Sequence, residues 1–210
     1  MFGSIMAEFS GNGLNMMNIS YQGGGNGHFD EEWFYQSYRP YMTDKDVDAL
    51  LEKTYGKDTK TIKAAYEKAY PGKDPFYIPY VANRTNEKAE AFTKMGGTAY
   101  QFVQGYILPM FGGITPWHTG GDIAWFFRNT DVMHMWLAGD EETADKISQT
   151  MATALVNFAY TGDPSQDGLA WPAFSIKNGE TMIFDVESEV RGYHDADLMK
   201  ALAPYQRGFF

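Results

Sequence analysis

The chain has 210 residues, a formal net charge of −10 and no cysteine. Its length is enough for one domain with a sizeable core, and its acidic balance argues against binding to the phosphate backbone of a nucleic acid. The absence of cysteine excludes disulfides, thiolate catalysis and cysteine-based metal sites, and it favours a microbial source. No apolar run approaches the roughly 18 residues of a membrane span. Residues 1–6 lack the basic start and long apolar run of a signal peptide, which leaves cytoplasmic and secreted locations open.

The first predicted element is a strand. Residues 2–7 form a short apolar run that ends at Glu8, and two glycine-rich stretches then predict a loop over residues 10–30. The second of these stretches, residues 22–27, is not followed by the lysine and Ser/Thr of a phosphate-binding loop. We therefore interpret it as a connection and not as a nucleotide site.

Three predicted helices follow. Thr43 and Asp46 have the spacing of a capping box, apolar residues then recur with helical spacing, and Gly56 ends the first helix. A second helix ends before Pro71, and a third covers residues 85–95 before a pair of glycines.

Two further strands and one long helix complete the pattern. Residues 99–106 alternate and are rich in aromatic and β-branched side chains, which predicts a strand. Residues 141–160 carry one apolar helical face, and residues 181–184 predict the last strand. Three strands so far apart cannot close a barrel. We therefore predict an α/β fold that is mostly helical, with a few strands at the edge of a larger sheet.

His118 is the strongest candidate for catalysis among the histidines. It lies in the turn-rich stretch 115–122, just beyond the second predicted strand, where α/β folds present reactive groups. We interpret His28 and His194 as ordinary surface residues and His134 as a structural residue in a helix. The histidines lack the paired spacing of a zinc site, so the sequence predicts no metal site.

The serines lack one well-known catalytic context. No serine has glycine both two positions before it and two positions after it. The sequence therefore contains no nucleophile elbow of the Gly-x-Ser-x-Gly type.

Three groups of residues together resemble one known family. They are Gly3–Ser10; Trp117 and His118 followed by Asp122, Ile123, Phe126 and Phe127; and Asn157–Pro164 followed by Trp171–Phe174 and Thr181–Asp185. These stretches resemble the C-terminal part of type B carboxylesterases, the α/β-hydrolase group that also contains the cholinesterases. The last group, which pairs Thr-Gly-Asp-Pro with Trp-Pro-Ala-Phe, is the most specific, and the resemblance extends from about residue 3 to residue 190.

The resemblance implies that Glu8 is the triad acid and His118 the general base of a serine hydrolase that acts on a small-molecule carboxylic ester without a cofactor. It also implies that residues 1–210 are a C-terminal fragment of one catalytic domain, because the family carries its nucleophile elbow and oxyanion loop further towards the N-terminus. The fragment would be inactive alone. Relative to the family pattern there is one extra residue between His118 and Asp122, which leaves the role of Asp122 open. Asp122 is the fallback acid if Glu8 and His118 lie apart.

The fragment interpretation also implies partners. The first is the N-terminal half of the same enzyme, and the second is another copy of this chain in a homodimer or strand-swapped oligomer, because strands at 3–7 and 99–106 would be left without neighbours. Two other functions stay open: a non-catalytic binding or adhesion member of the same fold family, and a free-standing helical binding domain. The third group of residues argues against the helical domain.

Overall fold

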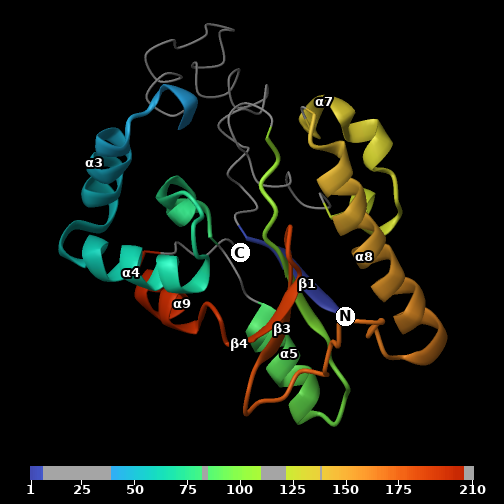
Figure 1. Ribbon diagram of the computed structural model, residues 1–210. Helices are drawn as coiled ribbons and strands as arrows, with labels where there is room; N and C mark the ends of the chain where they lie inside the picture. Colours follow the sequence, from blue (N-terminus) through green and yellow to red (C-terminus); the bar gives the residue numbers. More distant parts are fainter. Residues whose placement is uncertain (7–38, 82–84, 110–121, 138, 206–210) are drawn as a thin grey trace, which may run out of the picture. The chain divides into compact units, whose positions relative to one another are not determined.

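The computed structural model describes residues 1–6, 39–81, 85–109, 122–137 and 139–205, and the chain divides into two compact units (Figure 1). Unit 1 comprises Met1–Glu8 and Ala82–His194, and unit 2 comprises Phe9–Val81 and Asp195–Phe210. The chain therefore passes from one unit to the other three times.

A four-stranded sheet lies at the centre of unit 1, in the order β1-β2-β3-β4. Its strands are β1 (Phe2–Ile5), β2 (Gln101–Gln104), β3 (Glu180–Phe184) and β4 (Glu189–Gly192). The first three run parallel, and β4 pairs antiparallel with β3. A mainly parallel sheet with helices between its strands is the α/β architecture that the sequence predicts.

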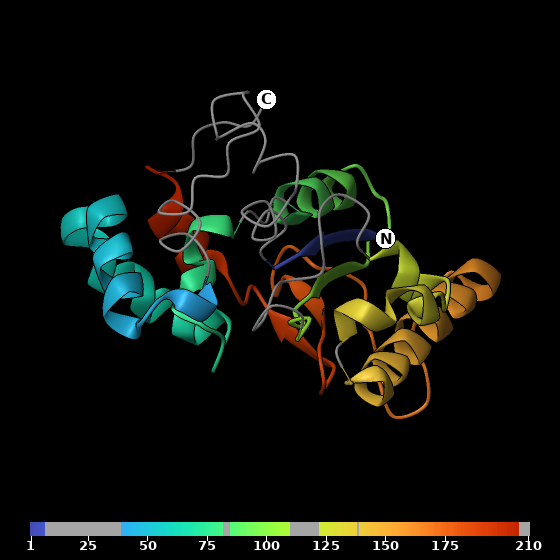
Figure 2. The same cartoon turned by 90° about the horizontal axis from the view of Figure 1, so that it is seen from above.

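Helices cover both faces of this sheet. Helix α5 (Thr85–Lys94) packs on one face, where the rings of Phe2 and Phe92 lie 5.7 Å apart. Helices α6 (Ile123–Phe126) and α8 (Glu141–Thr161) pack on the other, where Phe102 meets Phe126 at 5.1 Å. Figure 2 shows α5 and α8 on opposite sides of the strands. The alternation of side chains along a strand accounts for this, because successive residues point to opposite faces.

The rest of unit 1 fills the space beside α8. A 3-10 turn (Thr130–Met133) and α7 (His134–Leu137) connect α6 to α8. Helix α8 ends at Gly162, which adopts the left-handed φ of 77° that glycine accepts without strain. Trp171, which follows this helix, is fully buried against Phe184 and Phe102.

Unit 2 is helical in the residues described. Its helices are α3 (Asp44–Tyr55), α4 (Thr59–Ala69) and α9 (Ala196–Leu202), and 3-10 turns lie at Arg39–Tyr41, Gly56–Asp58 and Pro75–Tyr80. The C-terminal part of the chain completes this unit. Lys68 of α4 pairs with Asp197 of α9 at 2.6 Å, and the Tyr205 hydroxyl donates to the Tyr55 carbonyl and to the Asp58 carboxylate.

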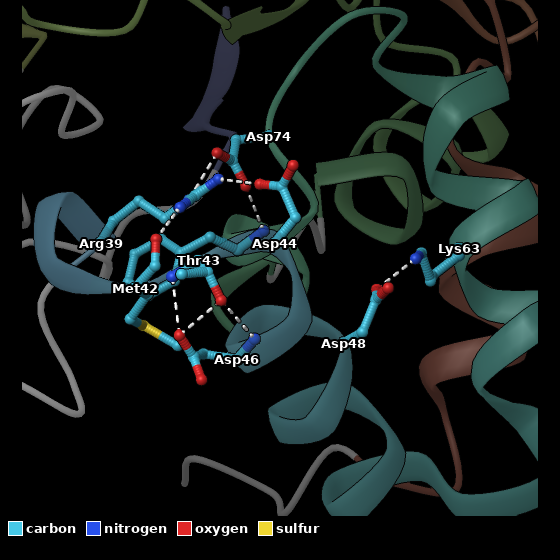
Figure 3. A network of polar contacts seen from close by, with 9 residues as sticks. Arg39, Met42, Thr43, Asp44, Asp46, Asp48, Lys63 and Asp74 are labelled. Atoms are coloured by element: carbon cyan, nitrogen blue, oxygen red, sulfur yellow. Dashed lines mark hydrogen bonds and ion pairs between the residues drawn. The ribbon is translucent and has the colours of Figure 1, made fainter.

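A polar network fixes the start of α3 (Figure 3). The Arg39 guanidinium donates to Asp74 at 2.6 Å, to Asp44 at 2.8 Å and to the Met42 carbonyl at 2.6 Å. Partial burial acts to lower the pKa of Arg39, but the two carboxylates outweigh it and raise that pKa. Arg39, in the 3-10 turn before α3, therefore ties the start of that helix to Asp74, the residue that precedes the 3-10 turn Pro75–Tyr80.

Most predicted elements are confirmed. The capping box at Thr43 forms, and the helices predicted up to Gly56, before Pro71, over 85–95 and over 141–160 are present with small shifts in their ends. The strand predicted over 99–106 is shorter, because only Gln101–Gln104 pair along their whole length with both neighbours. The predicted loop at 10–30 lies outside the described residues.

Candidate active site

The carboxyl ends of the three parallel strands lie side by side. Ile5 at the end of β1 is in register with Gln104 at the end of β2, and Gln104 is in register with Phe184 at the end of β3. The ladder continues past these ends, since the Met6 amide donates to the Gln104 carbonyl at 3.0 Å and the Gly105 amide donates to the Phe184 carbonyl at 2.8 Å. In open α/β sheets, ligands bind just beyond the carboxyl ends of the strands.

Both predicted catalytic residues follow strands that end here. Glu8 comes just after β1, and His118 lies on the chain between β2 and α6. Glu8 and His118 themselves lie outside the described residues, as does His28. Their approach to each other therefore stays a prediction. What is observed is that the strands leading to them are adjacent and parallel.

Asp122, the alternative acid, lies at the start of α6. Its carbonyl accepts hydrogen bonds from the Trp125 and Phe126 amides at 3.1 Å each. Its side chain does not cap the helix, and burial raises the pKa of its carboxyl group.

Helix α6 is held firmly against α8. The Trp125 side chain is fully buried, and its carbonyl accepts a 2.8 Å hydrogen bond from the buried Ser148 hydroxyl of α8. Arg128 follows α6 with a φ of 59°, an unfavourable left-handed conformation for a residue with a Cβ atom. Its guanidinium donates to the Asp145 carbonyl at 2.8 Å and pairs with the Asp145 carboxylate at 2.9 Å.

The end of β2 carries polar groups that the sequence does not single out. Gln104 is fully buried, and neither atom of its amide has a hydrogen-bond partner among the residues described. Tyr106 is also buried, and its hydroxyl donates to Asp140 at 2.6 Å. β2 also contains a second buried glutamine, Gln101, so the sequence pattern alone does not distinguish Gln104.

The two remaining histidines differ from each other. His134 begins α7 and is exposed, in agreement with a structural role. His194 is only 8% exposed, so its interpretation as a surface residue is wrong. It lies in the turn between β4 and α9, two elements that the sequence pattern does not predict.

Two negative observations apply to the part of the chain that the structure describes. Within it, no three His, Asp or Glu side chains are grouped so that they could hold a metal ion. No helix in these same ranges has both the length and the apolar character needed to cross a bilayer.

Comparisons with known proteins point to esterases. A para-nitrobenzyl esterase of Bacillus subtilis (strain 168) is 26% identical over 117 residues, which make up 50% of this chain and 24% of that protein. An esterase from the anaerobe Clostridium hathewayi that can hydrolyse aliphatic aromatic polyesters matches with a TM-score of 0.73 and 28% identity, over 80% of this chain and 34% of that chain. No family model matches the sequence.

A third comparison concerns the fold alone. A carboxylesterase of Geobacillus stearothermophilus matches with a TM-score of 0.56 and 18% identity, over 97% of this chain and 39% of that chain. The homologues are therefore esterases with the α/β-hydrolase fold, as the sequence motifs predict. This chain spans well under half of the length of each.

Proposed function

We propose that this chain, a homologue of the carboxylesterases, supplies the acid and the general base of a serine hydrolase that acts on carboxylic esters. Glu8 is the proposed acid and His118 the proposed base. The pairing of β1 with β2 carries the proposal. These parallel neighbours lead to Glu8 and to His118, and their carboxyl ends lie side by side. A pair of residues 110 positions apart in the sequence (118 − 8) needs such a pairing to meet.

The chemistry would follow the serine-triad scheme. A serine attacks the ester carbonyl while His118 takes its proton, and His118 then returns that proton to the leaving alcohol. Glu8 holds the imidazole in one tautomer and stabilises its protonated form. Water then releases the acyl group from the serine by the same route.

The serine would come from a partner polypeptide segment. No serine of this chain has the elbow context, and the chain corresponds to 34% of the Clostridium esterase. We therefore propose that residues 1–210 act together with an N-terminal part that carries the elbow and the oxyanion donors, and that they do not turn over esters alone.

Complementation tests this proposal. The chain is co-expressed with the N-terminal part of the Bacillus para-nitrobenzyl esterase, and hydrolysis of an unactivated ester is measured beside labelling by a serine-directed phosphonate. We expect turnover only when both parts are present. Glu8→Gln and His118→Ala should each lower kcat by about 10³-fold or more, as losses of triad members do.

Two matched variants serve as controls. His134→Ala removes an exposed histidine and should leave kcat unchanged. Asp122→Asn should retain turnover within about tenfold, whereas a loss equal to that of Glu8→Gln would make Asp122 the acid. Labelling of a serine within the 210-residue chain would contradict the proposal. An assembled but inactive and unlabelled complex would favour the non-catalytic binding protein.

A further inference from the structure

One Asn-Gly pair lies in the turn just before β3. The sequence contains three such pairs, at 12–13, 26–27 and 178–179, and the last is the one inside the described ranges. Asn178 is exposed, and Gly179 follows it with a left-handed φ of 63°. Because glycine has no side chain, its backbone can approach a neighbouring group unusually closely. Among the described asparagines, Asn178 is therefore the one least shielded from its own main chain.

Such a pair can undergo a spontaneous covalent change. The Gly179 nitrogen, once it has lost its proton, attacks Cγ of the Asn178 side chain. A new C–N bond forms, and the side-chain NH2 takes up a proton and leaves as ammonia. Water then opens the resulting succinimide ring at either of its carbonyl carbons. The product is aspartate or, where the main chain now runs through the former side-chain carbon, isoaspartate.

Hydrogen bonds hold both reacting groups of this pair. The Gly179 amide donates to the Ser175 carbonyl at 2.7 Å. The Asn178 side-chain NH2 donates to the Glu180 carboxylate at 2.9 Å. The first bond keeps the attacking nitrogen protonated and directed at Ser175, and the second fixes the carboxamide. The ring can close only after the first bond breaks and the carboxamide turns.

Glu180 is the centre of this turn. Its carboxylate also accepts from the Ser175 amide at 2.6 Å and from the Ser175 hydroxyl at 2.9 and 3.0 Å. Burial acts to raise the pKa of Glu180, but the hydrogen bonds from Asn178 and Ser175 outweigh it and lower that pKa. Glu180 therefore stays ionised at neutral and alkaline pH, where a backbone amide loses its proton most readily.

The products would fit this turn less well than Asn178 does. An aspartate at position 178 would replace a donor to Glu180 by a second negative charge. An isoaspartate would lengthen the main chain where it is crowded, since a Cβ atom at Gly192 of β4 would lie 2.6 Å from the Asn178 carbonyl oxygen. The Tyr193 amide also donates to the Gly179 carbonyl at 3.1 Å. Conversion would therefore disturb the pairing of β3 with β4.

We propose that Asn178 is a deamidation site of this chain and that Glu180 governs its rate by holding the turn closed. The inference does not depend on the proposed function, because the reaction needs only the turn and water. The folded chain should be modified slowly, at the rate at which the turn opens, and each conversion should weaken the hairpin of β3 and β4.

Peptide mapping of the 210-residue chain after incubation at about pH 8 tests this proposal, with asparagine, aspartate and isoaspartate at position 178 separated by chromatography. We expect Glu180→Ala to raise the rate of conversion by about 10-fold or more, because bonds to a charged group are lost. Strong denaturant should raise it at least as much. Glu187→Ala removes an exposed glutamate between β3 and β4 and should stay within about twofold of the parent.

A second variant keeps the test decisive if circular dichroism shows that Glu180→Ala does not fold. Ser175→Ala removes only the hydroxyl that donates to Glu180 and accepts from the Asn178 amide, and it should raise the rate by about two- to tenfold. Equal rates in the folded parent, in the folded variants and in denaturant would overturn the proposal. Slower conversion in folded Glu180→Ala would also overturn it, because the carboxylate would then promote ring closure.

Discussion

Gly3 lies in β1 next to Phe102 of β2, and a Cβ atom at Gly3 would overlap the Phe102 ring. This ring cannot move aside, because it is buried among Phe126, Trp171 and Phe184. We expect Gly3→Ala to lower the free energy of unfolding by about 1–3 kcal/mol, the usual cost of overpacking a core. Urea unfolding followed by tryptophan fluorescence measures it.

Gly97 provides the matched control at the same scale. A Cβ there would also meet a phenylalanine ring, but that ring belongs to Phe92, which is 40% exposed and can turn away. Gly97→Ala should therefore cost much less than Gly3→Ala. Equal costs would mean that the Phe102 ring is not held as tightly as its neighbours indicate.

Some residues near the candidate site can be predicted from the sequence and others cannot. His118 can be singled out because it lies in a turn-rich stretch after a predicted strand. Tyr106 and Ser148 cannot, since each looks like an ordinary member of its strand or helix until the contact with Trp125 or Asp140 is known. Long-range partners of this kind are a property of packing, and no local pattern encodes them.

At the level of elements, the cap of α3 can be tested directly. The Thr43 hydroxyl accepts from the Asp46 amide at 3.3 Å, and the Asp46 carboxylate accepts from the Thr43 amide at 2.7 Å. Thr43→Ala should lower the free energy of unfolding by about 1 kcal/mol. Thr54→Ala, which removes an exposed hydroxyl bonded within the same helix to Leu50, should have a clearly smaller effect.

The same cap predicts a dependence on pH. The hydrogen bonds from the Thr43 side chain and backbone lower the pKa of Asp46 below its ordinary value. A lowered folded-state pKa adds stability that is complete above the unfolded pKa of about 3.9 and is lost as pH falls through the folded value. The difference in denaturation midpoint between the parent and Asp46→Asn should thus be constant from pH 6 to 8 and shrink below about pH 4. A difference that persists unchanged at pH 2.5 would contradict the charged cap.

Prediction from sequence succeeded for some elements and failed for others for physical reasons. Helix α8 is long and has one apolar face, so its periodicity is clear. Strand β4, Glu189–Gly192, carries charged residues and is partly exposed, so only its hydrogen bonds to β3 reveal it. Helix α9 is only seven residues long, which leaves too few turns for a periodic signal.

On the scale of the whole molecule, the two edges of the sheet differ. The β4 edge carries Glu189 and Arg191, charges that discourage pairing with another chain. β1 is apolar, and among the described residues it pairs only with β2. Ile123, Phe127 and Val132, on and beyond α6, are more than half exposed. Such surfaces promote association.

We therefore expect the chain alone to self-associate and to bind a hydrophobic dye. Sedimentation velocity should detect dimers or larger species, and dye fluorescence should fall when the N-terminal esterase part is co-expressed, because that part would pair with β1. A strictly monomeric chain that binds no dye would contradict this expectation.

The three passages of the chain between its units have a consequence for biosynthesis. β1 is made first, yet its partner β2 follows only after all of Phe9–Val81 has been translated. At about 5–20 residues per second, β1 waits on the order of 5–20 seconds for β2. The entropy cost of closing that long loop must be met before β1 can pair with β2. The pairing that would bring the segment next to Glu8 towards that of His118 can therefore form only after β2 has been synthesised.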